Sequence, residues 1–189
     1  MAAKLLIFSA PSGSGKTTLV HHLLRHFPNI QFSISATSRE RRAYETDSKD
    51  YHFIHTDQFR EKIASGDFVE WEEVYPGTYY GTLKSEINRI LEQGNSVIFD
   101  VDVQGGLNIK KQYGPEALAV FVKVASIEIL RDRLIGRNTE SPEKLAMRLA
   151  KAEEEMKFET AFDVVIVNHE LEAAKKEAVQ LVDTFLNAK

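Results

Sequence analysis

The chain has 189 residues, the length of one compact domain that buries a hydrophobic core without disulfide support. Its composition, 43% hydrophobic and 28% charged with no cysteine, excludes collagen-like, coiled-coil and disordered proteins, and also disulfide frameworks and thiolate chemistry. The net charge of −4 excludes bulk attraction to nucleic acid or to an anionic membrane, so any anion site must be local.

The chain opens with an apolar run that predicts a buried strand over Leu5–Ser9, because the run is short and ends in turn residues. This run is too short to span a membrane or to serve as a secretory signal, so we expect a cytoplasmic protein. A helix is predicted next over residues 16–27, where Leu19, Leu23 and Leu24 share one face and Pro28 ends the pattern.

Residues 31–82 differ in character from the rest of the chain. They contain several aromatic residues, a group of arginines and two short alternating stretches, residues 51–55 and 68–74. Alternation with a period of two is typical of strands that have one covered face. We therefore expect an inserted, partly antiparallel substrate lobe in this region, with Trp71 in its hydrophobic core.

Strand-like and helix-like patterns alternate over the remaining sequence. Further strands are predicted over residues 97–101, 119–124 and Val164–Val167, and helices over residues 83–91, 127–135, 142–158 and 171–186. Most of the strand runs are apolar throughout, which is typical of parallel strands that are covered on both faces. The alternation therefore predicts a three-layer α/β domain.

Residues 10–17 form the motif with the most specific chemistry. They match the phosphate-binding pattern G-x-x-x-x-G-K-[ST], except that Ala10 stands at the first glycine. In such a loop the backbone N–H groups turn inward around phosphate oxygens and the following helix N-terminus favours an anion. Lys16 would neutralise the β and γ phosphates, and the Thr17 hydroxyl would bind Mg²⁺. The alternative is an ordinary Gly/Ser turn.

Two further groups of residues fit a phosphate site. Asp100 and Asp102 end an apolar strand at positions i and i+2, so they face the same side of the sheet, where ligands of parallel sheets bind. Asp100 is a candidate Mg²⁺ ligand through water, and Asp102 a candidate substrate contact; the alternative is a pair of solvated aspartates. A second cluster, comprising Ser35, Arg39, Arg41 and Arg42, is suited to a second anionic substrate, unless it is a solvated charge run.

At this point the sequence closely resembles the guanylate kinase family of P-loop nucleoside monophosphate kinases. The resemblance covers nearly the whole chain and rests on residues 9–17, 37–42, 51–53, 68–71, 79–82, 100–105, 133–137 and 165–168. It implies a three-layer α/β P-loop kinase with a parallel core sheet, an inserted, partly antiparallel lobe that binds the nucleoside monophosphate, and a helical lid. The single domain would comprise a core (1–30, 83–125 and 160–189), a GMP-binding lobe (31–82) and a lid (about 126–159).

The same resemblance implies transfer of the γ-phosphoryl group of ATP to GMP, and to dGMP, with Mg²⁺ as cofactor. ATP would be held by Ser12, Gly13, Ser14, Gly15, Lys16, Thr17, Thr18 and Asn168, and Mg²⁺ by Thr17 and Asp100. The GMP phosphate would contact Arg39, Arg42, Tyr51 and Tyr80, and the guanine would contact Ser35, Glu70, Thr82 and Asp102. The catalytic cations would be Lys16, Arg133, Arg137 and Arg148.

The role of Glu70 also has support from elementary chemistry. A carboxylate accepts hydrogen bonds from both N1–H and the 2-amino group of guanine, whereas the N1 of adenine is itself an acceptor. A site built to hydrogen-bond one substrate rejects an analogue that lacks the bond by roughly 10⁴-fold or more. The alternative is that Glu70 is one of several exposed acids on its strand. For the other assigned residues there are alternatives too. Each lid arginine could instead form a surface ion pair with Glu140, Glu143 or Glu153. Tyr51 and Tyr80 could be core aromatic residues.

Two other functions stay open at the level of sequence. A related kinase could use ribose 1,5-bisphosphate as acceptor, since the arginine cluster would serve it equally, although the guanine-reading residues would then lack a purpose. A guanylate kinase-like protein-binding module would keep the fold and lose catalysis, and its expected marks are a degraded phosphate loop and missing lid arginines. We expect small-molecule substrates, no nucleic acid or membrane partner, and a monomer or homodimer.

Overall fold

Five parallel strands form the central sheet of the computed structural model, which describes residues 3–136 and 142–188. The strand order is β2-β7-β1-β8-β9, with bounds Ile30–Phe32, Ser96–Val101, Leu5–Ser9, Ala117–Lys123 and Val164–Val167. All four neighbouring pairs are parallel. The predicted parallel sheet is therefore confirmed, and the physical reason is the one that the apolar runs indicate, because helices cover both faces.

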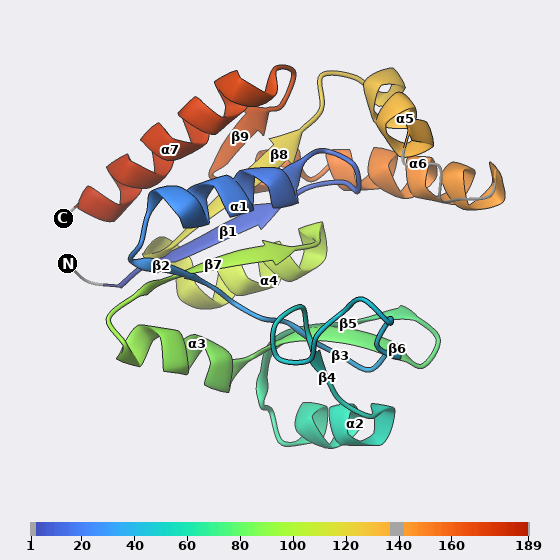
Figure 1. Ribbon diagram of the computed structural model, residues 1–189, viewed down its shortest axis with the longest axis vertical. Helices are drawn as coiled ribbons and strands as arrows, with labels where there is room; N and C mark the ends of the chain where they lie inside the picture. The colour runs from blue at the N-terminus through green and yellow to red at the C-terminus, as the bar shows by residue number, and fades with distance from the viewer. Residues whose placement is uncertain (1–2, 137–141, 189) are drawn as a thin grey trace.

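The two faces of the sheet carry separate hydrophobic clusters. Helices α1 (Lys16–His26) and α7 (Leu171–Asn187) lie over one face, and α3 (Lys84–Glu92) and α4 (Val103–Tyr113) over the other (Figure 1). Along β1 the side chains alternate between these clusters, since Leu6 and Phe8 pack under α1 while Leu5 and Ile7 pack under α3 and α4. The three-layer architecture is confirmed.

A second, mixed sheet interrupts the α/β pattern. Its order is β4-β3-β6-β5, with bounds His52–Phe53, Ala36–Thr37, Thr78–Leu83 and Phe68–Tyr75. β6 pairs antiparallel with both β3 and β5, whereas β3 and β4 are parallel. Helix α2 (Thr56–Ala64) covers this sheet through Phe59, whose ring stacks 4.3 Å from that of Phe68. The expectation of a partly antiparallel lobe is confirmed.

The expectation that Trp71 lies in a hydrophobic core is wrong. Its side chain is 44% exposed and tilts against the ring of Tyr79, with 6.2 Å between ring centroids. β5 is the edge strand of the mixed sheet, and the short helix α2 packs mainly on Phe68 and Tyr79 through Phe59. Little therefore covers the outer end of β5, and Trp71 remains half in solvent.

Helices α5 (Ile127–Gly136) and α6 (Pro142–Met156) form a further unit beside the carboxyl ends of β1 and β8 (Figure 1). They pack on each other through a small cluster of buried residues, Val124, Leu130, Leu134 and Ala152. Arg137, a predicted catalytic residue, lies outside the described residues. Two short 3₁₀ turns, Gly114–Glu116 and Glu159–Ala161, complete the described elements.

Two helices of the structure have no counterpart in the sequence prediction, α2 and α4. α4 carries Gly105 and Gly106 in its first turn, and adjacent glycines normally weaken a helix. Packing explains the exception, because a Cβ at Gly106 would lie 2.1 Å from the Ser9 hydroxyl of β1. The close approach of α4 to the sheet therefore requires glycine, and the helix is stabilised by the Asp102 cap instead.

Candidate active site

The phosphate loop connects β1 to α1 and has the geometry that its glycines predict. Gly13 and Gly15 have φ angles of +95° and +89°, which side chains rarely allow. A Cβ at Gly15 would also lie 2.3 Å from the amide nitrogen of Asn168. Ala10 is buried and does not take a positive φ, so this position tolerates alanine. Among the described residues no side chain caps the start of α1, so its N–H groups can bind an anion.

Asp100 ties the loop lysine and threonine to the central sheet. Its two carboxylate oxygens lie 2.6 Å from the ammonium group of Lys16 and 2.6 Å from the hydroxyl of Thr17. Lys16 also donates to the carbonyl of Val101. The parallel register of β1 and β7, in which Phe8 lies beside Asp100, brings these groups to the same sheet edge. A hydroxyl and a carboxylate are hard oxygen donors, so this pair fits Mg²⁺.

A cleft of about 390 Å³ opens over the phosphate loop. Besides loop residues 10–18, which include Thr18, it is lined by Tyr75, Asp100, Asp102, Arg148, Lys151 and Glu155. Arg148 reaches it from α6, and its guanidinium donates to the hydroxyl of Ser12 over 3.0 Å. Arg133 behaves differently, since it donates to the backbone carbonyl of Asn168 over 3.1 Å. Of the two described lid arginines, Arg148 lines the cleft and Arg133 supports its wall.

Asn168 holds the phosphate loop from behind. It is 2% exposed, and its side-chain amide donates to the carbonyl of Ser14 over 2.7 Å. The hydroxyl of Ser14 and the side-chain oxygen of Asn168 are buried, and neither has a hydrogen-bond partner within residues 3–136 and 142–188. Buried polar atoms are normally satisfied, so these two oxygens are unpaired acceptors packed behind the phosphate loop. Asn168, which is predicted to contact ATP, therefore also helps to hold the shape of the phosphate loop.

We expect Asn168→Ala to raise the KM for ATP by about tenfold and to lower stability by about 1–3 kcal/mol, the usual cost of losing a buried hydrogen bond. The Ser14 carbonyl loses its partner, and the loop is held less firmly. Steady-state kinetics and thermal melting measure both effects. Asn108→Ala, on the exposed side of α4, is the matched control. An unchanged KM for ATP would show that the loop keeps its shape without this amide.

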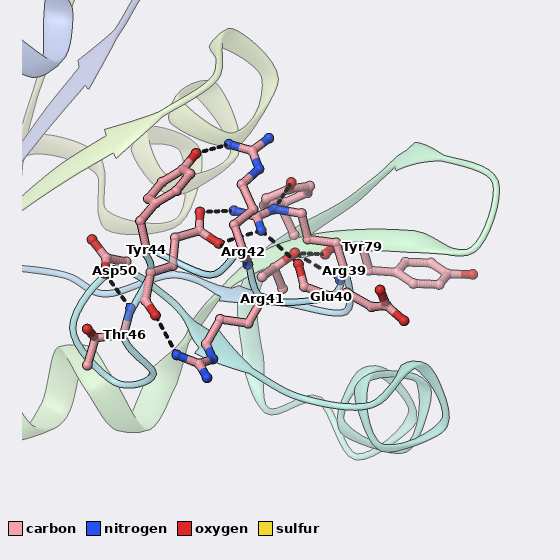
Figure 2. A network of polar contacts seen from close by, with 11 residues as sticks. Arg39, Glu40, Arg41, Arg42, Tyr44, Thr46, Asp50 and Tyr79 are labelled. Carbon is pink, nitrogen blue, oxygen red and sulfur yellow. Dashed lines mark hydrogen bonds and ion pairs between the residues drawn. The ribbon is translucent and has the colours of Figure 1, made fainter.

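Arg39 lies at the centre of a polar network in the loop that follows β3 (Figure 2). Its guanidinium makes a bidentate pair with Glu45, at 2.8 and 2.6 Å, and its Nε donates to the Tyr80 hydroxyl over 3.0 Å. The guanidinium carbon also lies 5.1 Å from the ring centroid of Tyr51. Three of the predicted phosphate contacts, Arg39, Tyr51 and Tyr80, are therefore adjacent.

Arg42 joins this network through its backbone. Its N–H donates to Glu45 over 2.8 Å, while its guanidinium donates to the exposed Tyr44 hydroxyl over 2.9 Å. Figure 2 shows the guanidinium groups of Arg41 and Arg42 on opposite sides of the loop, and Arg41 donates to the Glu45 carbonyl over 2.6 Å. The Arg42 guanidinium therefore lies at the exposed edge of the loop, with the Tyr44 hydroxyl as its hydrogen-bond partner.

Glu45 organises the network and was not identified from the sequence. Its side chain is only 7% exposed, and the hydrogen bond from Arg39, reinforced by the Arg42 N–H, lowers the pKa of Glu45 to about 2 despite burial. The carboxylate is therefore ionised at neutral pH and fixes the plane of the Arg39 guanidinium. The sequence signal that could have identified Glu45 is its place as a lone acid three residues after the last arginine of a basic loop.

We expect Glu45→Ala to raise the KM for an anionic acceptor by about tenfold, since charge-assisted hydrogen bonds of this kind contribute about 1.5–3 kcal/mol. The turnover number and the KM for ATP stay close to wild type because the phosphate loop is elsewhere. Initial rates at varied acceptor concentration measure the effect, and Glu40→Ala, an exposed neighbour, is the control. A lower acceptor KM would mean that the Glu45 carboxylate competes with the acceptor phosphate.

Glu70 and Thr82 face each other across β5 and β6. They are register partners, and the Thr82 hydroxyl donates to Glu70 over 2.6 Å. Burial raises the pKa of Glu70 to about 7, the Asp102 charge adds to the shift, and the Thr82 hydrogen bond opposes it. A Cβ at Gly105 would lie 2.9 Å from a Glu70 oxygen and 3.3 Å from an Asp102 oxygen, so both carboxylates adjoin the start of α4.

The structure therefore brings three of the four predicted guanine contacts together: Glu70, Thr82 and Asp102. Ser35 lies in the segment between β2 and β3, and its backbone carbonyl accepts from the His52 N–H over 2.9 Å. Burial raises the pKa of Tyr51, and the charge of Asp100 contributes to the shift. Tyr51 also adjoins Tyr80, with 5.8 Å between their ring centroids.

The structure thus combines a phosphate loop at the edge of a parallel sheet with a separate lobe that carries a bidentate arginine pair and the Glu70 carboxylate. This arrangement is that of the P-loop nucleoside monophosphate kinases. The sequence model of guanylate kinases matches residues 2–186, and the chain belongs to the guanylate kinase family.

Individual relatives agree with this membership over nearly the full length. The chain is 53% identical to guanylate kinase of Bacteroides thetaiotaomicron, covering 99% of this chain and 92% of the relative, and 45% identical to that of Salinibacter ruber, covering 97% of each. The crystal structure of guanylate kinase from Anaplasma phagocytophilum aligns over 100% of this chain and 88% of its own, with a TM-score of 0.77 and 25% identity. Within the described residues, no helix is long and apolar enough to cross a membrane.

Proposed function

We propose that this protein transfers the γ-phosphoryl group of ATP to GMP, giving ADP and GDP in purine nucleotide metabolism. Full-length membership of the guanylate kinase family supports this activity. The observation that carries the acceptor is the Glu70–Thr82 pair beside Asp102, which presents carboxylate oxygens where a base with an N1–H and an amino group would dock. dGMP shares that base and is included as a substrate.

The chemistry follows from the charges around the cleft. An oxygen of the GMP phosphate attacks the γ-phosphorus of ATP, and the bond from that phosphorus to the β–γ bridging oxygen breaks, with ADP leaving. The attacking atom is already an oxyanion, so no general base is needed. Lys16 and Arg148 neutralise charge on the transferring group, and Arg137 is assigned to the same task. Thr17 and Asp100 would hold Mg²⁺, which would supply charge neutralisation on the ATP phosphates when bound.

The remaining residues bind and orient the two substrates. We assign ATP to Ser12, Gly13, Ser14, Gly15, Lys16, Thr17, Thr18 and Asn168, with Arg133 supporting Asn168. We assign the GMP phosphate to Arg39, Arg42, Tyr51 and Tyr80, and the guanine to Ser35, Glu70, Thr82 and Asp102. Positioning both reactants in line supplies most of the rate enhancement in this reaction class, because there is little covalent chemistry for the protein to do.

We propose that three parts of one domain have separate roles. The core comprises residues 1–30, 83–125 and 160–189, the GMP lobe residues 31–82 and the lid about residues 126–159. Closure of lobe and lid excludes water, which would otherwise hydrolyse ATP. We place the reaction in the cytoplasm, carried out by a monomer or homodimer without a nucleic acid or membrane partner, since the net charge of −4 offers no general attraction to polyanions.

The test is ADP formation from ATP and Mg²⁺ with GMP, AMP and ribose 1,5-bisphosphate supplied as separate acceptors. We expect rapid turnover with GMP and at least about 10³-fold lower kcat/KM with AMP, because AMP lacks the N1–H and the amino group. Turnover with ribose 1,5-bisphosphate alone would show that the acceptor is the sugar bisphosphate and not GMP. ATP binding without turnover on any acceptor would favour a protein-binding module, which the intact Lys16, Thr17 and Arg148 argue against.

A further inference from the structure

Glu86 is a buried acid that the proposed reaction does not use. It lies in the first turn of α3, and its side chain is only 6% exposed. A buried carboxylate is costly unless it is paired and hydrogen-bonded. Arg89, one turn along the same helix, provides the ion pair, since its Nη2 and Nε donate to the two carboxylate oxygens over 2.9 and 3.0 Å. An ionised carboxylate can accept more than these two bonds, so Glu86 can hold a further donor.

The further donor comes from the segment between β2 and β3. The backbone N–H of Ile34 donates to Oε1 of Glu86 over 3.3 Å. Burial opposes ionisation of this carboxyl group, but the hydrogen bonds from Arg89 and from the Ile34 N–H outweigh it and lower the pKa of Glu86 below its usual range. Glu86 is therefore ionised at neutral pH, and it ties α3 to a segment that belongs to no helix or strand.

Ser35 follows Ile34 and is the predicted guanine contact in this segment. The pairing of β3 with β6 begins at Ala36, so Ser35 lies just outside the paired strands. Its place depends on two neighbouring contacts: the Ser35 carbonyl accepts from the His52 N–H over 2.9 Å, and the Ile34 N–H is held by Glu86. Of these two contacts, only the one to Glu86 uses a side chain, so a substitution can remove it.

Glu86 is also connected to the other half of the predicted guanine site. It follows Thr82 by four residues, because β6 runs directly into α3, and the Thr82 hydroxyl donates to Glu70. One carboxylate thus links the part of the chain that carries Thr82 to the segment that carries Ser35. Because this carboxylate is buried and ion-paired, it is held in one place, and it sets how far Ser35 lies from Thr82.

We propose that Glu86 is a positioning residue for guanine recognition, which holds Ser35 at the distance from Thr82 that the base requires. This rests on the proposed function, in which Ser35 and Thr82 contact the guanine of GMP. Glu86 acts through the Ile34 N–H and is assigned to neither substrate. Its loss therefore weakens GMP binding and leaves ATP binding and the phosphoryl-transfer step unchanged.

The first experiment compares three substitutions in steady-state kinetics. Glu86→Ala and Glu86→Asp both remove the acceptor within reach of the Ile34 N–H, whereas Glu86→Gln keeps an amide oxygen there. We expect alanine and aspartate to raise the KM for GMP by about tenfold, with kcat and the KM for ATP within about twofold of wild type, and glutamine to stay within about threefold in all constants. Glu92→Ala, an exposed acid at the end of α3, is the matched control and leaves all three constants unchanged.

AMP as acceptor separates positioning from a general loosening of the lobe. A loosened lobe would lose kcat/KM for both acceptors alike, whereas a misplaced Ser35 affects only the base that it contacts. We expect Glu86→Ala to lower kcat/KM for GMP by about tenfold and to leave kcat/KM for AMP within about twofold. An equal loss with both acceptors would show a merely structural role and overturn the proposal.

A double-mutant cycle tests whether Glu86 acts through Ser35. If Glu86 only positions the Ser35 hydroxyl, then adding Glu86→Ala to Ser35→Ala changes the KM for GMP by less than about twofold. Effects that multiply would mean that Glu86 acts by another route and would overturn the proposal. A wild-type KM for GMP in Glu86→Ala, or a glutamine variant as poor as alanine, overturns it too.

A failure of the proposed function is seen separately, because the wild-type enzyme would then show no turnover with GMP. GMP affinity by calorimetry over the same variants, and hydrogen exchange of the Ile34 amide followed by NMR without substrate, then test Glu86. We expect about tenfold faster exchange in Glu86→Ala and the wild-type rate in Glu86→Gln. Equal exchange rates in all three proteins would overturn the proposal. If alanine does not fold, Glu86→Asp takes its place in every comparison.

Discussion

Replacing Lys16 with methionine is expected to lower kcat for phosphoryl transfer from ATP to GMP by about 10³-fold, the usual effect of removing one preorganised stabiliser of transition-state charge. Methionine keeps most of the straight side chain and removes the ammonium group, which lies between the phosphate loop and Asp100. Asp100 then loses its cation, and the ATP phosphates meet an uncompensated carboxylate. The KM for GMP is expected to stay within about threefold, because the contacts of the acceptor lobe do not include Lys16.

The measurement needs a stopped assay sensitive enough for the slow variant, together with GMP binding by calorimetry. Lys111→Met, an exposed lysine at the end of α4, is the matched control and is expected to retain full activity. A thermal melt separates loss of chemistry from loss of fold. A kcat within about tenfold of wild type would show that Arg148 and the metal ion suffice without this lysine.

The core of the fold could be predicted from residue patterns because its helices are periodic and most of its strands are continuous apolar runs. Leu5–Ser9 and Val164–Val167 agree with the predicted strands to the residue, and every end of the predicted helices lies within two residues of the observed end. The patterns failed where tertiary contact overrides local preference. α4 exists because Gly106 fits against Ser9, and β2 has only three residues, too few to show a period.

Within the candidate site, too, some residues could be predicted from local sequence and others depend on tertiary contacts. The phosphate loop is contiguous, so its spacing alone predicts Lys16, Thr17 and the two glycines that take positive φ angles. The acceptor lobe is assembled from separate strands, so the proximity of Glu70, Thr82 and Asp102 depends on the β5–β6 register and on α4, which no local pattern encodes. Glu45 was missed for a related reason, since it acts on another side chain and bears no motif of its own.

Glu70→Gln is expected to lower kcat/KM for GMP by about 10³-fold while the KM for ATP stays within about twofold. The glutamine amide turns a donor toward the N1–H and amino donors of guanine, so at least one buried pair is left unmatched. The GMP-to-AMP selectivity falls correspondingly, and initial rates with both acceptors measure it. Glu73→Gln, an exposed neighbour that keeps its acceptor oxygen for the Gly77 N–H, is the control. Undiminished GMP selectivity in Glu70→Gln would contradict the guanine-reading role.

The same substitution is expected to stabilise the free enzyme at alkaline pH. The pKa of Glu70 is raised from 4.5 in the unfolded chain to about 7 in the fold, so the folded state binds more protons between these values. Stability from this group is therefore complete below about pH 4.5 and is lost as pH rises through 7, at a cost of about 3 kcal/mol. Glutamine does not titrate, so its stability relative to wild type rises between pH 5 and pH 8 in urea unfolding. A pH-independent difference would mean that Glu70 is already ionised in the empty site. The expected rise would show that Glu70 is a buried acid that lowers the stability of the free enzyme. Its hydrogen-bond partner would be the guanine of the substrate, so the position of Glu70 exchanges stability for specificity.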